Sequence, residues 1–255
     1  MRICLIGAGN LATQLGMALS EKGHQIVQVW SQTSNSAAQL ALKLNCSFTT
    51  DTDSITSDTG IYIIAINDQE ISNLLARKHW GKILVVHTSG STPMDILAPY
   101  CENFGVFYPF QTFSRDKKVD FNQVPFCIEA NTPQNLEVLN QMAMSLSQNI
   151  RHLDSLQRQQ IHLAAVFACN FVNHFYAVGK ELLQEKGIDF ELLKPLILET
   201  AQKALEQAPE TAQSGPAIRN DRATMEKHLG MLARHPDLKD LYAQISQRII
   251  QTHKI

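Results

Sequence analysis

The sequence lacks an excess of charge of either sign, and it lacks any long uncharged apolar run. Its 255 residues include 22 Lys and Arg against 24 Asp and Glu, for a formal net charge of −2. A nucleic-acid-binding protein needs a basic surface, so we expect neither DNA nor RNA as a main partner. No uncharged apolar stretch approaches the roughly 20 residues that cross a bilayer, so we expect no membrane segment.

The sequence also lacks a signal-peptide pattern and a disulfide pattern, and both absences bear on the cellular compartment of the protein. The apolar stretch at residues 3–8 has no basic region of any weight before it and runs into glycine-rich sequence, so it predicts a buried strand and not a signal peptide. The cysteines are scattered along the chain: Cys4, Cys46, Cys101, Cys127 and Cys169. An odd, scattered set argues against disulfides and against a metal site, and favours reduced core thiols in a cytoplasmic protein.

The chain divides into two parts of different texture. Up to about residue 150, short β-rich runs alternate with helical segments, and Ile61–Ile66 is a continuous apolar run typical of a strand buried on both faces. This alternation predicts an α/β Rossmann-type domain over residues 1–150, with a parallel sheet and helices on both faces. Residues 151–255 are predicted to form an all-α domain for substrate binding and dimerisation.

Dimerisation is expected from one long helix in the second part, predicted from about Ser155 to Lys186. Between Leu163 and Val178 it is apolar around most of its circumference, and such a helix needs burial on several sides. A helical domain of ~100 residues has little core of its own with which to bury it. We therefore expect a homodimer.

A dinucleotide fingerprint follows the first predicted strand. Gly7, Gly9 and Ala12 occupy the three fixed positions of G-x-G-x-x-A, between a strand and a helix. Gly7 permits the tight turn, Gly9 lets the backbone approach a pyrophosphate, and Ala12 packs the helix against the strand. We expect Asn10 and Leu11, at the start of that helix, to contact the cofactor as well.

The end of the second strand bears on which dinucleotide binds. NAD sites place an acidic residue there to hold the ribose 2′-hydroxyl. Here the segment contains Ser31, Gln32 and Thr33 and no acid. Hydroxyls and amides accommodate a 2′-phosphate without repelling it, so the segment favours NADP over NAD, although no arginine is present.

Further cofactor contacts are predicted where later strands end, because ligands of open α/β sheets bind beyond the carboxyl ends of the strands. Ile66 ends one buried strand, with Asn67 directly after it, and Thr88 lies at the end of the next. Asp68 is expected to cap the helix that follows Asn67.

Three later segments carry a family resemblance: H-T-S-G at residues 87–90, Y-P-x-Q-T-F at 108–113 and G-P-x-x-R-x-D at 215–221. With the fingerprint, they resemble bacterial proteins that join a Rossmann-like domain to a DUF2520 domain. That group is described as NADP oxidoreductases and is distantly similar to pyrroline-5-carboxylate reductases and to 3-hydroxyacid and 6-phosphogluconate dehydrogenases. The resemblance implies a 6-phosphogluconate dehydrogenase-like fold, the cofactor class and dimerisation, but no substrate.

Four residues are candidates for the reaction centre. His87 and Ser89 end a buried strand where the nicotinamide is expected, and a histidine there could transfer a proton. The alternative for His87 is a histidine bonded to the backbone. On the long helix, Asn170 and His174 lie four residues apart in apolar surroundings, so we expect them to face a polar cleft, a partner chain or each other.

The 3-hydroxyacid dehydrogenases carry a catalytic lysine and an asparagine, four residues apart, on the corresponding helix. Matching Asn170 to that asparagine places Val166 at the lysine position, and matching it to the lysine places His174 second. Neither alignment restores the lysine, which argues against hydroxyacid chemistry of that type.

The fingerprint and the resemblance together predict an NADP-dependent oxidoreductase that transfers hydride between nicotinamide and a small carbonyl or imine substrate. The alternative is a non-catalytic NADP-binding sensor or assembly protein.

Overall fold

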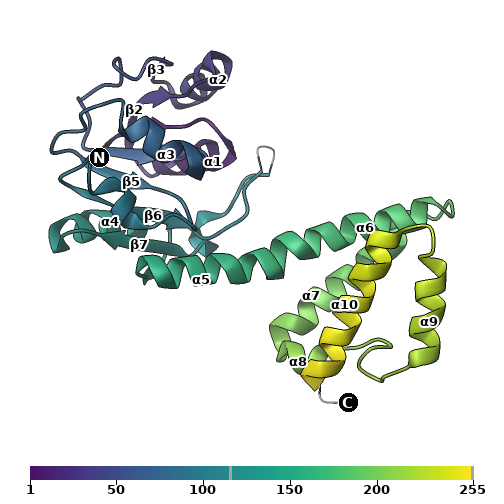
Figure 1. The fold of residues 1–255 in the computed structure, drawn as a ribbon. Helices are drawn as coiled ribbons and strands as arrows, with labels where there is room; N and C mark the ends of the chain where they lie inside the picture. Colours follow the sequence, from purple (N-terminus) through teal and green to yellow (C-terminus); the bar gives the residue numbers. More distant parts are fainter. Residues whose placement is uncertain (115–116, 254–255) are drawn as a thin grey trace. The chain divides into compact units, whose positions relative to one another are not determined.

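The computed structural model describes residues 1–114 and 117–253 and separates into two compact units, Met1–Val172 and Asn173–Ile255 (Figure 1). This division falls within the predicted long helix, whereas the sequence textures change before it. The strands of the first unit are β1 (Arg2–Ile6), β2 (Gln25–Trp30), β3 (Ser47–Thr49), β4 (Ile61–Ile64), β5 (Leu84–His87), β6 (Phe104–Pro109), β7 (Phe126–Ala130) and β8 (Ile150–His152).

The strands form one sheet in the order β3-β2-β1-β4-β5-β6-β7-β8, which confirms the predicted Rossmann-type fold. All neighbours pair in parallel except β6 and β7, which are antiparallel. The sequence did not predict this reversal or β8. A parallel pair needs a crossover element, and residues 110–125 contain only a short 3₁₀ turn, Phe121–Gln123, among the described residues.

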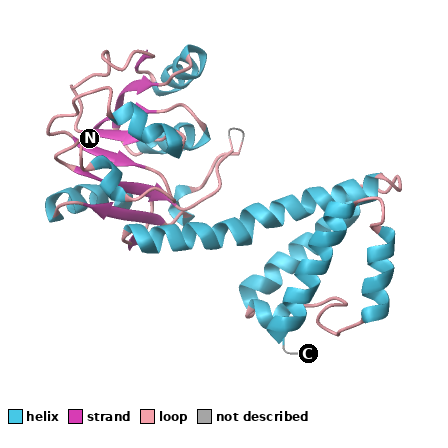
Figure 2. Ribbon diagram, viewed as in Figure 1, coloured by secondary structure: helices cyan, strands magenta, loops and turns pink. Residues whose placement is uncertain are grey.

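Helices flank the sheet (Figure 2), and apolar side chains form two core clusters in this unit. Alternate residues of β1 show the division, since Ile3 and Leu5 belong to one core cluster and Cys4 and Ile6 to the other. The helices of this unit are α1 (Asn10–Glu21), α2 (Ser34–Leu44), α3 (Asp68–Leu75) and α4 (Pro133–Leu146). The first cluster contains buried side chains of α1, α2 and α4, and the second contains those of α3, so the helices lie on both faces, as predicted.

The predicted long helix is continuous but changes its winding. It consists of α5 (Ser155–Ala165), a π-helical segment (Val166–Phe171) and α6 (Val172–Gln184). The remaining elements are a 3₁₀ turn (Phe190–Leu193), α7 (Lys194–Glu206), α8 (Pro209–Ala212), α9 (Arg222–Met231) and α10 (Pro236–His253). Pro195 lies in the first turn of α7, where proline costs no hydrogen bond.

The helical part leaves nearly all of its described apolar side chains at least partly exposed in the single chain. Of the described residues beyond 172, only Ala217 and Leu232 are buried. The helix Ser155–Gln184 is also long and apolar enough to cross a membrane by length and composition. That test therefore does not support the expected absence of a membrane segment. It is weak evidence for a span, because apolar helices of soluble proteins pass it too.

Candidate functional site

A groove of about 560 Å³ runs along the carboxyl ends of β1, β2, β4, β5 and β6. All ten residues predicted to contact the cofactor line it. They come from separate loops of the first unit, and the parallel sheet brings those loops to one edge.

The turn after β1 requires glycine at its first position. Gly7 has a φ of +126°, and its N–H donates to the Trp30 carbonyl at 2.7 Å. A Cβ at Gly7 would lie 2.2 Å from the Ala65 carbonyl oxygen. Gly9 is extended, and a Cβ there would meet nothing within 4 Å. Glycine is therefore required at Gly7 because a side chain would collide with the backbone at Ala65. At Gly9 the space beside the backbone is open to a ligand.

Two helices begin at the groove with free N-termini. Gly9 is the N-cap of α1 and Thr33 is the N-cap of α2; neither helix has a side-chain cap or an acid in its first turn. Each therefore offers unpaired backbone N–H groups and a positive dipole end to an anion. By contrast, Asp68 and Glu70 lie in the first turn of α3. The groove thus has two places for anions, and NADP carries a pyrophosphate and a 2′-phosphate.

The side chains near α2 fit a phosphate through hydrogen bonds instead of charge. Ser31, Gln32 and Ser36 line the groove beside Thr33, and none of the described lining residues is a lysine or an arginine. The donor set is therefore hydroxyls, an amide and the α2 backbone. These residues fit NADP in the way that the sequence predicted.

Asp68 has a different role from the predicted helix cap. The N-cap of α3 is Asn67, and the Asp68 carboxylate accepts hydrogen bonds from the hydroxyls of Ser89, at 2.7 Å, and of Ser91. The Ser89 oxygen also accepts from the Thr92 N–H at 2.9 Å. Ser89 lines the groove as predicted, but its hydroxyl proton already has an acceptor.

His87 lies behind the groove and is not among its lining residues. Its side chain is 0% exposed, and its Nδ1 accepts from the Ser89 N–H at 3.2 Å. Burial, followed by the nearby Arg158 charge, lowers the pKa of His87 to about 4, so its ring is neutral near pH 7. The structure therefore favours the alternative role, a histidine bonded to the backbone.

A tyrosine and a histidine meet at the groove wall instead. Tyr108, at the end of β6, and His162, on α5, both line the groove, with Tyr108 Oη 3.2 Å from His162 Nδ1. The sequence analysis missed His162. His162 lies one turn after Arg158, but only the structure shows that Arg158 is fully buried and so marks the face of α5 that packs on the sheet.

A buried ion pair anchors α5 to the sheet. The Arg158 guanidinium donates to the Glu129 carboxylate of β7 and to the Thr92 carbonyl, the latter at 2.6 Å. Ser155 Oγ also donates to Glu129, at 2.9 Å. A buried charge is costly without its partner, so these bonds strongly constrain the start of the helix that carries His162.

The predicted helix pair is not part of this groove. Asn170 lies in the π-helical stretch of the first unit and His174 belongs to the second unit; both are exposed in the single chain. The expectation that they face a polar cleft, a partner chain or each other therefore stays a prediction, and in the single chain both side chains are open to a partner. Their catalytic role stays a prediction. Asn170 lies in a π-helical segment, and such segments occur frequently at functional sites, which supports testing Asn170 by mutation.

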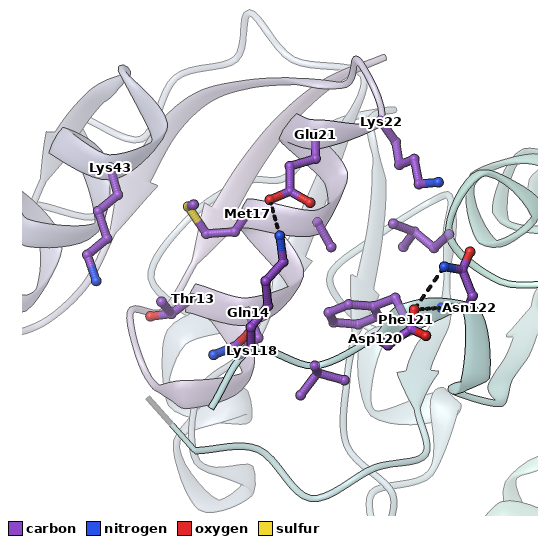
Figure 3. Close-up of a pocket in the computed structure, with 13 residues that line it drawn as sticks. Thr13, Gln14, Met17, Glu21, Lys22, Lys43, Lys118, Asp120, Phe121 and Asn122 are labelled. Atoms are coloured by element: carbon purple, nitrogen blue, oxygen red, sulfur yellow. Dashed lines mark hydrogen bonds and ion pairs between the residues drawn. The ribbon is translucent and has the colours of Figure 1, made fainter. Parts of the chain in front are cut away.

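A larger cavity of about 890 Å³ lies along α1 (Figure 3). It contains none of the predicted site residues, and its ionic contact is an exposed pair between Lys118 and Glu21 at 2.8 Å. Lys22 and Lys43 at its rim are exposed. Volume alone does not make a site, and no convergent set of buried polar groups is present here among the described residues.

The fold and groove define a Rossmann-type nucleotide-binding protein of the NADP oxidoreductase class. Residues 2–90 match the family model described as NADP oxidoreductase, coenzyme F420-dependent, and residues 124–249 match the DUF2520 model, a domain of unknown function. A crystal structure of a candidate NADP oxidoreductase from Bacteroides fragilis is 45% identical, with a TM-score of 0.94, over 100% of this chain and 98% of that one. The chain belongs to the same family, in which the two domains follow one another.

More distant structures share the fold. An imine reductase from Myxococcus stipitatus in complex with NADP⁺ is 13% identical, with a TM-score of 0.72, over 99% of this chain and 95% of that one. A 1-pyrroline-5-carboxylate reductase from Streptococcus pyogenes is 12% identical, with a TM-score of 0.65, over 100% and 99%. The comparison with curated proteins gives no match. The predicted recognition and NADP cofactor class are confirmed at the level of the family.

Proposed function

We propose that the protein is an NADPH-dependent reductase of a small carbonyl or imine compound. The observation that carries the proposal is the groove itself, where the ten predicted cofactor residues and two free helix N-termini meet a wall of polar side chains. When bound, NADPH supplies a hydride from nicotinamide C4. The protein's own task is to orient the cofactor and to provide the proton.

The residues of the groove divide this task. The α1 N-terminus at Asn10 and Leu11 holds the pyrophosphate, and Ser31–Thr33 with the α2 N-terminus hold the 2′-phosphate. Thr88 and Ser89 border the nicotinamide end, where the Asp68–Ser89 hydrogen bond keeps the loop in place. A proton then has to come from a neighbouring side chain or from water.

The imine arm of the proposal is supported by the names of the structural neighbours. An imine reductase and a pyrroline-5-carboxylate reductase share the fold, and both names denote reduction of a C=N bond. Their low identity leaves the substrate of this chain open to experiment. A small cyclic imine is the first compound to test, and 2-oxo acids are the second.

A second candidate function is the non-catalytic NADP-binding sensor or assembly protein. One observation favours it, the absence of a catalytic lysine. No lysine lines the groove among the described residues. On the long helix, the lysine position of the 3-hydroxyacid dehydrogenases falls on Val166 in one alignment and on Asn170, with His174 four residues later, in the other. This candidate binds NADPH as tightly as an enzyme but consumes none.

We also propose that the protein works as a homodimer formed through its helical part. The support is the set of large apolar side chains that stay exposed in one chain, including Phe167, Phe171 and Phe175 on the long helix. A second copy of the same helices can cover them, because a C₂ interface pairs each surface with itself.

The free cysteines fit a cytoplasmic location.

Consumption of NADPH by the purified protein tests the enzyme proposal. The assay combines the protein and NADPH with 1-pyrroline, and separately with a panel of acyclic imines and 2-oxo acids. We expect at least one compound to increase NADPH oxidation above the rate without it. No consumption with any compound, together with tight NADPH binding in a fluorescence titration, would support the sensor instead.

A further inference from the structure

Tyr108 and His162 lie together at the groove wall but 54 positions apart in the sequence. We propose that Tyr108 is the residue that gives a proton to the substrate heteroatom, and that His162 relays the replacement proton to it. This proposal rests on the reductase function proposed above. It places the proton donor on β6 and the relay residue on α5. Neither His87 nor the Asn170–His174 pair then serves as the proton donor.

The first support is the close packing around Gly90. A Cβ at this position would lie 2.6 Å from His162 Nδ1 and 2.8 Å from Tyr108 Oη. Gly90 belongs to the loop after β5 that borders the groove. The missing side chain therefore leaves room for the phenol and the imidazole to meet at the point where they also reach the cavity.

The second support is the chemistry of the pair. Burial raises the pKa of Tyr108 to about 12, so the phenol carries its proton near neutral pH. The charged or titratable groups acting on it are Cys127 of β7, Arg158 of α5 and Asp68 of α3. The hydroxyl of Tyr108 is 3.2 Å from an imidazole nitrogen, which can either donate to the phenol oxygen or accept from it.

The step balances for a carbonyl substrate. Hydride adds to the carbonyl carbon, the C=O π pair moves to oxygen, and that oxygen takes the Tyr108 proton as an alcohol forms. The phenolate then takes the Nδ1 proton of the His162 ring while Nε2 takes a proton from solvent, and exchange with solvent restores the original tautomer. With an imine, Tyr108 protonates nitrogen first and hydride then adds to the iminium carbon.

The chain contains a matched control for this pair. In the second unit, Tyr242 Oη lies 2.9 Å from His228 Nδ1, so the same two groups meet in a different place. Tyr242→Phe removes one hydroxyl of the same kind from α10. It has no part in the nucleotide groove of the first unit.

The kinetic test uses Tyr108→Phe, His162→Asn and the control Tyr242→Phe, with the best substrate of the imine and oxo-acid panel. We expect Tyr108→Phe to slow single-turnover NADPH oxidation about 100-fold, within the usual range for a general acid. His162→Asn should instead lower steady-state kcat about 10-fold, because His162 acts after hydride transfer by returning the proton to Tyr108. The Kd for NADPH should change less than about threefold, and Tyr242→Phe should keep the parent rate. Parent-like rates in Tyr108→Phe would overturn the proposal.

A spectroscopic test does not depend on turnover. The ring ¹⁵N signals of His162 are followed in protein labelled at histidine, with and without saturating NADP⁺. We expect both NADP⁺ binding and Tyr108→Phe to shift the Nδ1 signal, while Tyr242→Phe shifts only that of His228. A His162 signal indifferent to Tyr108→Phe or to NADP⁺ would overturn the pair, whereas failure of the whole panel with both shifts present would count against the reductase function alone.

Discussion

The Arg158 guanidinium and the Glu129 carboxylate form a buried ion pair that joins α5 to β7. The Arg158 side chain is 1% exposed and that of Glu129 is 17% exposed, so solvent screens this contact little. The pair holds the first turns of α5, and through them it places His162 at the groove.

Glu129→Ala should destabilise the first unit by about 3–5 kcal/mol, because it leaves the Arg158 charge buried without its partner. Urea unfolding at pH 7, monitored by circular dichroism, measures the change. The control is Glu21→Ala, which breaks the exposed pair with Lys118 and should cost less than about 1 kcal/mol. Equal losses in the two variants would show that the buried pair is not a special anchor.

Gly9→Asp should abolish NADPH binding while the fold survives. The new Cβ enters open space at an extended position, and the carboxylate then competes with the pyrophosphate for the α1 N-terminus. We expect a rise of ~100-fold or more in Kd, or about 3 kcal/mol of binding free energy. The measurement is a fluorescence titration with NADPH.

Gly9→Asn is the matched control, because it adds a side chain of the same size without the charge. We expect it to lose less affinity than Gly9→Asp, and both variants to keep the parent circular dichroism spectrum. Parent-like NADPH affinity in Gly9→Asp would refute the placement of the cofactor on this turn.

Gly90→Ala should lower turnover by about 10-fold or more with little effect on stability, because the atoms that a Cβ meets belong to side-chain ends that can move. Moving them separates Tyr108 from His162. The control Gly60→Ala adds a Cβ whose nearest neighbour is the Arg2 carbonyl oxygen at 3.5 Å, an ordinary contact. Steady-state kinetics and thermal unfolding of both variants check this; unchanged turnover in Gly90→Ala would contradict it.

The buried His87 should make the protein less stable as the pH falls. Its folded-state pKa of about 4 is below the value of 6.5 for an unperturbed histidine, so between these values the unfolded chain binds a proton that the folded chain does not. Stability should therefore be lost as the pH falls from about 6.5 towards 4, by about 3 kcal/mol if the whole shift is realised. Urea unfolding across this range should show a weaker pH dependence in His87→Gln than in the parent, and equal slopes would contradict the assignment.

The apolar surface of the helical part should be an interface between two copies. Light scattering at micromolar concentration should give about twice the 28.5 kDa mass of one chain. Phe171→Glu, which places a charge on this surface, should shift the protein towards the monomer. The control is Leu42→Glu, which places the same charge at an exposed residue of α2 and should leave the mass unchanged. A parent protein with the mass of one chain would contradict the dimer proposal.

The sequence by itself determined the parallel part of the Rossmann sheet, although not the reversal at β7 or the strand β8, and it predicted the cofactor residues that line the groove. The G-x-G-x-x-A turn, Ser31–Thr33 and the residues after β4 and β5 are local signals, each read within a few positions of a strand end. Because parallel strands present their carboxyl ends at one edge, knowing the strands was enough to bring these residues together.

Only the tertiary structure decided which side chains reach the groove beside the cofactor positions. His87 ends its strand on the side that is buried, whereas Tyr108 and His162 meet across 54 residues of sequence. That meeting depends on the packing of α5 against the sheet through Arg158 and Glu129, which are themselves 29 positions apart. Such contacts leave no periodic signal in a sequence, because the apolar pattern specifies which faces are buried and not which polar groups become neighbours when they pack.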